Sequence, residues 1–355
     1  MVRNLLVTGG AGFIGLNYLI YHLKNYDDNV IVLDSLTYAA SKDEVKSLDK
    51  LNPKIHYKFY HGSINDTSLV EDIFTKYHID TVINFAAESH VDRSIQSSDP
   101  FINTNILGTH NLLKVCLKYF IDMGWNGHFH QISTDEVYGS LKIDDLPFLE
   151  TTQYAPNSPY AASKQSADML CRAFHKTYGL NVTISHCSNN YGPYQDIEKL
   201  IPKTIKSLLL GDNVTIYGDG RQIRDWIYVL DHIKGIELIV DKREPFNVYN
   251  LGANKEITNI DIINTIIKVF KELYQTNNLL FKDFLECPLT KGQALENLVI
   301  HVSDRPGHDR RYAIDFNKAS KNLGYSPTFS FESAIKDTVL WYLKNYQWWK
   351  LRLNR

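Results

Sequence analysis

A glycine-rich turn stands directly after the first apolar run of the chain. The run is Leu5-Leu6-Val7, and it leads into glycines at positions 9, 10, 12 and 15. The spacing fits Gly-x-Gly-x-x-Gly from position 10, and Gly9, Gly12 and Gly15 fit its wider variant. Without side chains, such a turn lets the backbone approach a diphosphate, while the following helix offers unpaired N–H groups and its positive dipole end. A strand, this turn and a helix in succession predict a dinucleotide site.

Short apolar runs alternate with longer helical patterns over the first two thirds of the chain. The runs that we expect to be strands span 4–8, 30–34, 81–86, 128–133 and 181–186. This alternation is typical of right-handed β-α-β units. It predicts an α/β fold, a doubly wound parallel sheet of Rossmann type with helices on both faces.

The pattern changes near residue 190 to mixed, shorter elements. At 355 residues the chain is long enough for about two domains of roughly 150 residues each. We expect a dinucleotide-binding domain over 1–190 and a smaller mixed domain over 191–355, with an apolar run at 246–251 returning to the sheet. The polar, irregular stretch 270–297 is interpreted as an insertion without an assigned function.

Charge and cysteine content argue against several classes of partner and site. A formal net charge of −2 gives no general attraction to nucleic acid or to an anionic membrane. The four cysteines form no Cys-x-x-Cys pair and no zinc spacing with histidine, so we expect reduced, partly buried thiols and no metal. No signal-peptide core follows the first methionine, and no apolar stretch reaches about 18 residues. We therefore expect a cytoplasmic enzyme.

Asp34 predicts which dinucleotide binds. It ends the second expected strand, 19 residues after Gly15, where a carboxylate accepts hydrogen bonds from the adenosine ribose hydroxyls. Its charge would repel a 2'-phosphate, and Ser35 rather than an arginine follows it. The pattern therefore favours NAD over NADP. The alternative is a tight turn with a capping aspartate, which the strand-turn-helix context disfavours.

Tyr160 and Lys164 form a candidate pair for proton and hydride chemistry. Ser158-Pro159 is typical of an N-cap and a first helical position, which places the two side chains one turn apart on the same helix face. The ammonium, with a positive nicotinamide, would favour the phenolate and lower the pKa of Tyr160 from about 10. Tyr160 could then take a proton from a sugar hydroxyl. The alternative is a surface tyrosine over a solvated lysine.

Thr134-Asp135-Glu136 follow the fourth expected strand, at the carboxyl end of the sheet where ligands bind. Elimination of water needs one protonated and one ionised acid, and two close carboxyls separate their titrations by mutual repulsion. Thr134 can donate a hydrogen bond to a sugar oxygen. A solvated acidic turn is the alternative. Together with the Tyr/Lys pair, these residues predict an oxidation-assisted elimination.

Several longer motifs make the chain resemble the extended short-chain dehydrogenase/reductases, and within them the nucleotide-sugar 4,6-dehydratases. They include TGGAGFIG (8–15), LTYA (36–39), AAESHVDRSI (86–95), STDEVYG (133–139), SPYAASK (158–164), CSNNYGPYQ (187–195), EKLIP (198–202), YGDG (217–220), IRDWIYV (223–229) and DRPGHDRRYAID (304–315). Related epimerases share the glycines and the Tyr/Lys pair but typically lack the Asp-Glu pair.

The resemblance implies binding roles at matching positions. Beside the glycines, Asp34, Tyr160 and Lys164, the NAD site would include Phe13, Ile14, Leu36, Thr37, Ser63, Ile64, Ala86, Ala87, Thr104 and Asn189. The nucleotide sugar, in a C-terminal substrate domain, would be held by Ser89, Thr134, Asn190, Lys199, Leu200, Tyr217, Arg224, Asn259, Arg305 and His308. Arginine forks suit diphosphate oxygens, although either arginine could instead form a surface or interdomain ion pair.

The implied reaction is a 4,6-dehydration of a nucleotide-diphosphate-glucose with internally recycled NAD, leading to deoxysugars such as rhamnose. Tyr160 takes the C4 hydroxyl proton, Glu136 the C5 proton, and Asp135 protonates the departing C6 hydroxyl. The tyrosine, the lysine and the Asp-Glu pair are all present in the sequence, which argues against a non-catalytic NAD-binding regulator.

The sequence leaves the nucleobase of the substrate open between thymine and uracil: dTDP-glucose is favoured, and UDP-glucose is the alternative. The third candidate function is that of a 4-epimerase. Ser63 replaces the family's usual aspartate near the adenine, and residues 195–199 (QDIEK) depart from the family pattern beside the nucleotide pocket. The resemblance also implies a homodimer formed by helices near 105–119 and 160–177. The alternative is that these helices pack only within the subunit.

Overall fold

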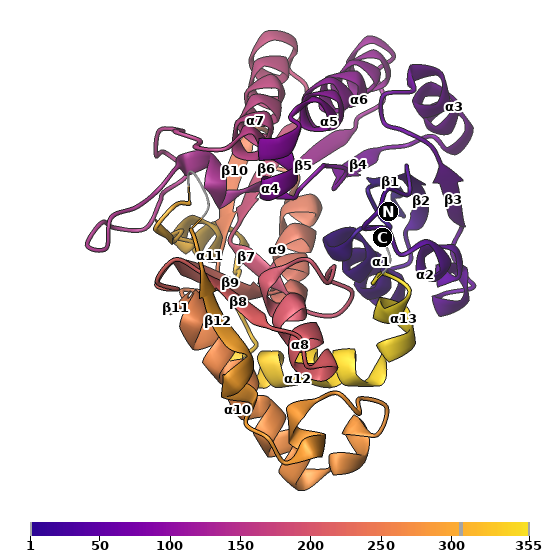
Figure 1. The fold of residues 1–355 in the computed structure, drawn as a ribbon. Helices are drawn as coiled ribbons and strands as arrows, with labels where there is room; N and C mark the ends of the chain where they lie inside the picture. The colour runs from indigo at the N-terminus through magenta and orange to yellow at the C-terminus, as the bar shows by residue number, and fades with distance from the viewer. Residues whose placement is uncertain (1, 305–307, 354–355) are drawn as a thin grey trace.

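A seven-stranded parallel sheet forms the centre of the molecule (Figure 1). The structure is a computed structural model that describes residues 2–304 and 308–353. In spatial order the strands are β10 (Asn247–Leu251), β6 (Val182–Cys187), β5 (His128–Thr134), β4 (Thr81–Asn84), β1 (Asn4–Thr8), β2 (Asn29–Asp34) and β3 (Tyr57–His61). The order reverses between β1 and β4, where doubly wound sheets bind their ligands. The predicted fold class is confirmed.

Helices cover both faces of this sheet (Figure 1). On one face lie α1 (Phe13–Asn25) and α9 (Val229–Lys242); on the other lie α3 (Thr67–Tyr77), α6 (Thr109–Cys116) and α7 (Pro159–Tyr178). The short elements of this part are α2 (Lys42–Lys46), α4 (Val91–Gln96), α5 (Asp99–Phe101), η1 (Leu48–Leu51), η2 (Ile102–Gly108), η3 (Leu117–Asp122) and η4 (Asp135–Tyr138).

The remaining elements form a smaller mixed group, seen in the lower half of Figure 1. Strand β9 (Ile223–Tyr228) pairs with β7 (Asn189–Tyr191), β11 (Glu256–Thr258) and β13 (Arg311–Tyr312), and β8 (Val214–Tyr217) pairs with β12 (Val299–Val302). The helices are α8 (Leu200–Leu210), α10 (Asn259–Thr276), α11 (Asn317–Leu323), α12 (Phe331–Lys344) and α13 (Tyr346–Lys350), with short turns η5 (Asn278–Phe281), η6 (Pro288–Lys291) and η7 (Leu295–Leu298).

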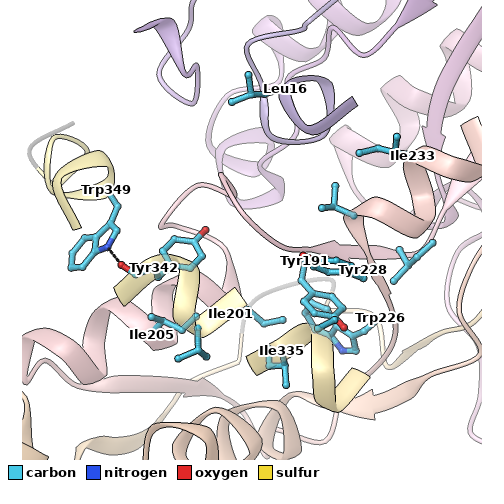
Figure 2. Close-up of a cluster of buried hydrophobic side chains, with 14 of the residues drawn as sticks. Leu16, Tyr191, Ile201, Ile205, Trp226, Tyr228, Ile233, Ile335, Tyr342 and Trp349 are labelled. Carbon is cyan, nitrogen blue, oxygen red and sulfur yellow. Dashed lines mark hydrogen bonds between the residues drawn. The ribbon is translucent and has the colours of Figure 1, made fainter. Parts of the chain in front are cut away.

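One buried apolar cluster joins the two parts of the chain (Figure 2). Leu16 of α1 and Ile233 of α9 belong to it, as do Ile201 of α8 and Ile335 of α12. Because α9 and β10 lie beyond residue 190 and still pack on or in the central sheet, the chain crosses between its two parts more than once. The domain boundary near residue 190 stays a prediction.

Two features differ from the sequence interpretation. Strand β3 was not predicted, because its side chains lie at the sheet edge and none of the five is fully buried, which leaves a weak apolar signal. The interpretation of 270–297 as polar and irregular is wrong in part, although 277–297 forms only short turns and is mostly exposed. The first residues of 270–297 complete α10, and Phe270, Phe281 and Phe284 are buried in the main core.

All four cysteines are free and buried. Within residues 2–304 and 308–353, none of the helices has the length and apolar character to cross a membrane.

A buried charged cluster connects α1 with α9 and with the start of β2. The His22 ring lies with Nδ1 2.7 Å from Glu237 Oε1 and Nε2 3.4 Å from Asp28 Oδ2, and Arg3 Nη2 lies 2.6 Å from the same Asp28 oxygen. Burial alone would lower the pKa of His22, but the hydrogen bonds to Asp28 and Glu237 outweigh burial and raise it. His22 is therefore a buried group whose charged form is stabilised by folding.

We expect the His22 contribution to the free energy of unfolding to be lost as the pH rises. A histidine pKa raised on folding stabilises the protein fully below its unfolded value of about 6.5, and this contribution disappears as the pH passes the folded value. Asp28, whose pKa is lowered, loses its contribution only at acidic pH. Denaturant unfolding of wild type and His22→Gln at several pH values above about 6 measures the difference. His56→Gln, at an exposed site, is the control; equal pH slopes in all three proteins would contradict the prediction.

Candidate active site

A cavity of about 310 Å³ lies at the carboxyl ends of the central strands. It is lined by all five predicted catalytic residues, Thr134, Asp135, Glu136, Tyr160 and Lys164. The predicted cofactor residues that line it are Gly9, Gly12, Phe13, Ile14, Gly15, Asp34, Thr37, Ser63, Ile64, Ala86, Ala87, Thr104 and Asn189. Leu36 is not among the lining residues. Its backbone N–H donates to Asp34 instead, from a left-handed conformation with φ of 53°.

The glycine turn has the shape that a dinucleotide cradle requires. Gly9 has a φ of 67°, and a Cβ there would lie 2.5 Å from the backbone nitrogen of Ala86. A Cβ at Gly15 would lie 2.4 Å from the Gly9 carbonyl oxygen, so α1 can approach the turn after β1 only with glycine at this position. Gly12 lines the cavity, and a Cβ there would meet only the Gly9 oxygen, at 3.3 Å. The backbone at Gly12 is therefore open to a ligand.

Asp34 ends β2 with its carboxylate fixed beside the turn. One oxygen accepts from the Ala11 N–H at 2.9 Å and the other from the Leu36 N–H at 2.7 Å. Burial raises the pKa of Asp34, and these two backbone bonds work against that rise. Each carboxylate oxygen has a second lone pair, so ribose hydroxyls can still donate to it.

The two acids follow β5 in the short helix η4. Asp135 is only 2% exposed, and Thr134 Oγ1 lies 3.4 Å from one of its oxygens and 3.4 Å from the Glu136 N–H. The other oxygen of Asp135 has no hydrogen-bond partner among the described residues. Burial raises the pKa of Asp135 well above its ordinary value, and the neighbouring charge of Glu136 raises it further. Asp135 is thus suited to carry a proton as an acid.

Tyr160 and Lys164 reach the cavity from the first turns of α7. Ser158 caps this helix, with its hydroxyl accepting from the Ala161 N–H at 3.1 Å. Lys164 is 4% exposed, and its Nζ donates to the Ile132 carbonyl of β5 at 2.6 Å. The lysine is therefore anchored to the strand that carries the two acids.

The predicted lowering of the Tyr160 pKa concerns the site with a positive nicotinamide bound and stays a prediction; without the cofactor the shift has the opposite direction. Burial raises the pKa of Tyr160 well above 10, and the charge of Glu136 adds to this effect. Burial also lowers the pKa of Lys164. The prediction counted the charges of the lysine and of the nicotinamide, and it left out the low dielectric of the buried site, which disfavours both charged forms.

The predicted substrate residues fall into two groups. Ser89, Thr134, Asn190 and Lys199 line the cavity, and Lys199 Nζ donates to the Ser89 carbonyl at 3.0 Å. Leu200, Tyr217, Arg224, Asn259 and His308 do not line it. Arg305 lies outside the described residues.

The second group gathers in the smaller part of the molecule. The Tyr217 and His308 rings meet edge to face with centroids 6.5 Å apart, and the Asn259 N–H donates to the Gln222 carbonyl. Arg224 is buried, donates to the Ile223 carbonyl at 2.7 Å, and stacks on a tyrosine ring at 4.2 Å. Its charge lowers the pKa of Asp135 against the effect of burial, so the arginine acts electrostatically on this candidate catalytic acid.

Sequence reasoning missed a contact that spans the cavity. Tyr38 OH donates to Glu198 Oε1 at 2.9 Å, and Arg93 lies 3.4 Å from the other oxygen while stacking 3.7 Å from the Tyr38 ring. Tyr38 and Glu198 both line the cavity. Both stand inside the motifs LTYA and EKLIP, so position in a motif was the available signal.

Among residues 2–304 and 308–353, no three histidine, cysteine or acidic side chains gather in an arrangement that could hold a metal ion.

Comparison with known proteins identifies relatives over nearly the whole chain. The profile of the GDP-mannose 4,6 dehydratase family matches residues 6–338. The dTDP-glucose 4,6-dehydratase of Salmonella typhimurium is 45% identical over 356 residues, covering 97% of this chain and 94% of that protein. The dTDP-glucose 4,6-dehydratases of Streptomyces venezuelae and Bacillus anthracis, both solved with NAD, are 39% identical, with TM-scores of 0.85 and 0.84 and coverage of 99% of this chain and 100% of theirs. The chain therefore belongs to the nucleotide-sugar 4,6-dehydratase family that the GDP-mannose 4,6 dehydratase profile describes, and within it to the dTDP-glucose 4,6-dehydratases.

Proposed function

We propose that the protein is an NAD-dependent hydro-lyase that converts dTDP-glucose to the 4-keto-6-deoxy sugar nucleotide and water. The observation that carries this proposal is the meeting of the Asp135-Glu136 pair with Tyr160 and Lys164 in one cavity beside the dinucleotide turn. A Tyr/Lys pair alone serves a redox reaction such as 4-epimerisation, whereas two adjacent acids add proton removal and loss of water. Identity of 45% to a dTDP-glucose 4,6-dehydratase supports the same reaction.

The cavity suits NAD. The open backbone at Gly12 and the helix start at Phe13 would face the diphosphate, and Asp34 would accept from the adenosine ribose. The buried carboxylate disfavours a 2'-phosphate, which supports NAD over NADP. When bound, NAD would supply the hydride acceptor for C4 of the sugar and the hydride donor for C6.

The side chains divide the proton transfers. Tyr160 takes the proton of the C4 hydroxyl, with Lys164 supporting the phenolate. A ketone at C4 acidifies the C5 proton, which Glu136 removes and, after water has left, returns to C5. Asp135, whose pKa is raised well above its ordinary value by burial, gives its proton to the C6 hydroxyl as this leaves as water. Thr134 donates to the sugar oxygen at C4.

The nucleotide sugar would extend from the acids toward the smaller part of the molecule. We assign residues 1–190 to NAD and 191–355 to the nucleotide sugar, apart from Ser89 and the catalytic residues. Asn190 and Lys199 would contact the ligand where the two parts meet, and Tyr217 with His308 would hold the base. Leu200, Asn259, Arg224 and Arg305 complete the proposed set.

Arg224→Met is expected to raise KM for dTDP-glucose by roughly 30-fold, equal to about 2 kcal/mol, because a desolvated diphosphate would lose its charge partner. Steady-state kinetics measure this change. Arg224→Lys keeps the charge without the fork, so its KM should lie between those of wild type and Arg224→Met. Arg221→Met, at an exposed position just before strand β9, should match wild type. An unchanged KM in Arg224→Met would place this arginine outside the diphosphate site.

The substrate assignment is tested by incubating the protein separately with dTDP-glucose and UDP-glucose and following the 4-keto product. A faster rate with UDP-glucose would reverse the predicted preference for thymine. Residues 195–199, which depart from the family pattern, are expected beside the nucleotide pocket. UDP-galactose formation without a keto product would instead identify a 4-epimerase. A purified protein that retains NADP would refute the cofactor choice.

We further propose that the protein is a homodimer. Leu107 of η2 and Met169 of α7 are 50% and 37% exposed, and η2 packs against α7, so these elements present apolar side chains to solvent in a single chain. Burial of such surface in a second copy is favourable. Leu107→Glu combined with Met169→Glu should therefore give monomers in light scattering, whereas Leu285→Glu, with Leu285 73% exposed in another region, should leave the dimer intact. A wild-type monomer at micromolar concentration would overturn the proposal.

We also propose a cytoplasmic location, because four free cysteines are typical of a reducing compartment. There the product would supply deoxysugar synthesis, rhamnose included. Cell fractionation tests the location.

A further inference from the structure

Asp168 is a buried carboxylate that lies outside the catalytic cavity, on the helix that carries Lys164 and in contact with strand β5. It stands one turn after Lys164 on α7, and its side chain is fully inaccessible to solvent. Its Oδ2 accepts from Ser133 Oγ at 2.7 Å and lies 3.0 Å from His186 Nε2. Ser133 directly precedes Thr134 on β5, so one carboxylate contacts the strand that carries the catalytic acids and shares a helix with the catalytic lysine.

Lys164 needs a buried counter-charge in order to remain an ammonium. It is 4% exposed, and its Nζ donates to the Ile132 carbonyl, which carries no net charge. A buried ammonium without a nearby anion loses its proton rather than bear the cost of desolvation. Burial indeed lowers the pKa of Lys164, and the charge of Asp168 is the largest influence that raises it.

Other titratable groups lie near both residues, and Asp135 and Glu136 line the same cavity as Lys164. Lys164 is faced by Tyr160 and Cys171 on its own helix and by Cys187 on β6. Asp168 is faced by His186 on β6, by Tyr138 and Tyr154 from the segment after β5, and by Cys171. Arg172, one turn further along α7, and Glu150 line the same neighbouring cavity as Asp168. Among these, Asp168 is the carboxylate on the same helix as Lys164.

We propose that Asp168 is a positioning residue for the dehydration: its buried negative charge keeps Lys164 protonated beside Tyr160, and its hydrogen bond to Ser133 fixes the end of β5. The inference rests on the proposed function, because Lys164 matters only if Tyr160 acts as the base. Since the carboxylate lies outside the cavity, it acts through Lys164 and makes no contact with the reacting sugar.

Asp168→Asn tests the role of the charge, because asparagine keeps the size of the side chain and can still accept from Ser133. Without the charge of Asp168, Lys164 should lose its proton at lower pH. The alkaline limb of the kcat profile should therefore move to lower pH by about one unit or more, and the activity should recover toward wild type as the pH is lowered. A uniformly reduced kcat with an unmoved limb would show a structural role only and overturn the proposal.

Matched variants separate charge from structure. Asp231→Asn removes another buried carboxylate, which accepts from the Thr328 and Phe329 N–H groups in the smaller part of the chain. It should lower the melting temperature and leave the pH profile in place. Ser133→Ala removes one hydrogen bond of Asp168 and leaves its charge, so it should lower kcat without moving the alkaline limb.

A measurement on the wild-type protein tests the proposal even if Asp168→Asn does not fold. Nitrogen-15 NMR of lysine-labelled protein, with Lys164→Met for assignment, reports the Lys164 proton directly and without substrate. An ammonium at neutral pH is expected, and a neutral amine would refute the role of Asp168. If Lys164 is charged but dTDP-glucose and UDP-glucose both give no product, the failure lies with the proposed function.

Discussion

Tyr160→Phe is expected to lower kcat by about 10³-fold, because the variant loses the group that accepts the C4 hydroxyl proton. Phenylalanine fills the same buried space, and Tyr160 is only 9% exposed, so the fold should be retained. KM for dTDP-glucose should change little, since the hydroxyl acts mainly in the transition state. Steady-state kinetics with a melting curve separate the loss of activity from any loss of stability.

Tyr178→Phe provides the matched control for this change. Tyr178 ends the same helix α7 and is 50% exposed, away from the cavity lining. Its replacement should leave kcat at the wild-type level. A fall of less than about tenfold in Tyr160→Phe would assign the proton to another base, since general base catalysis usually contributes at least 10²-fold.

The pH dependence should follow from the burial of Tyr160. Burial and the charge of Glu136 raise the pKa of Tyr160 in the protein without cofactor, so the phenolate is costly until a positive nicotinamide binds. Lys164 alone does not offset this cost. Because kcat is measured with NAD bound, the acidic limb of its pH profile reports the titration of Tyr160 in the occupied site. A titration of Tyr160 measured without NAD should lie at higher pH.

The sequence was sufficient for those parts of the site that lie in one contiguous motif. The glycine turn, Asp34, the Thr134-Asp135-Glu136 run and the Tyr160/Lys164 pair each occupy one strand end or one helix turn, and parallel strands bring these ends to one edge. Their meeting in one cavity follows from the fold class.

Contacts between distant segments could not be predicted in the same way. Tyr38 and Glu198 are 160 positions apart and hydrogen-bond across the cavity, and neither residue alone carries a chemical signal for this contact. Ser133, Asp168 and His186 likewise come from three elements. The direction of the Tyr160 pKa shift also depends on burial, which the sequence spacing of Tyr and Lys does not contain.

Glu136→Gln and Asp135→Asn are expected to stop the reaction at different stages, because the two acids serve different protons. Glutamine keeps the size of Glu136 but cannot remove the C5 proton. Glu136→Gln should therefore lose product formation by at least about 10²-fold and incorporate no solvent deuterium at C5 of recovered substrate. Oxidation at C4 remains possible, so reduced-nicotinamide absorbance should appear during a single turnover.

Asp135→Asn retains the C5 base and lacks the proton donor for the C6 hydroxyl. It should also lose product, but recovered substrate should carry deuterium at C5, because Glu136 can still exchange that proton once C4 is oxidised. Asp135 is buried and its pKa is raised, so it is the better placed of the two acids to hold a proton at neutral pH. Tyr160→Phe should show neither deuterium nor reduced-nicotinamide absorbance, since C4 is not oxidised. Mass spectrometry of recovered substrate and product distinguishes the three variants. Deuterium at C5 in Glu136→Gln at the level of Asp135→Asn would show that the two carboxyls exchange roles, and the assignment of base and acid would then have to be reversed or shared.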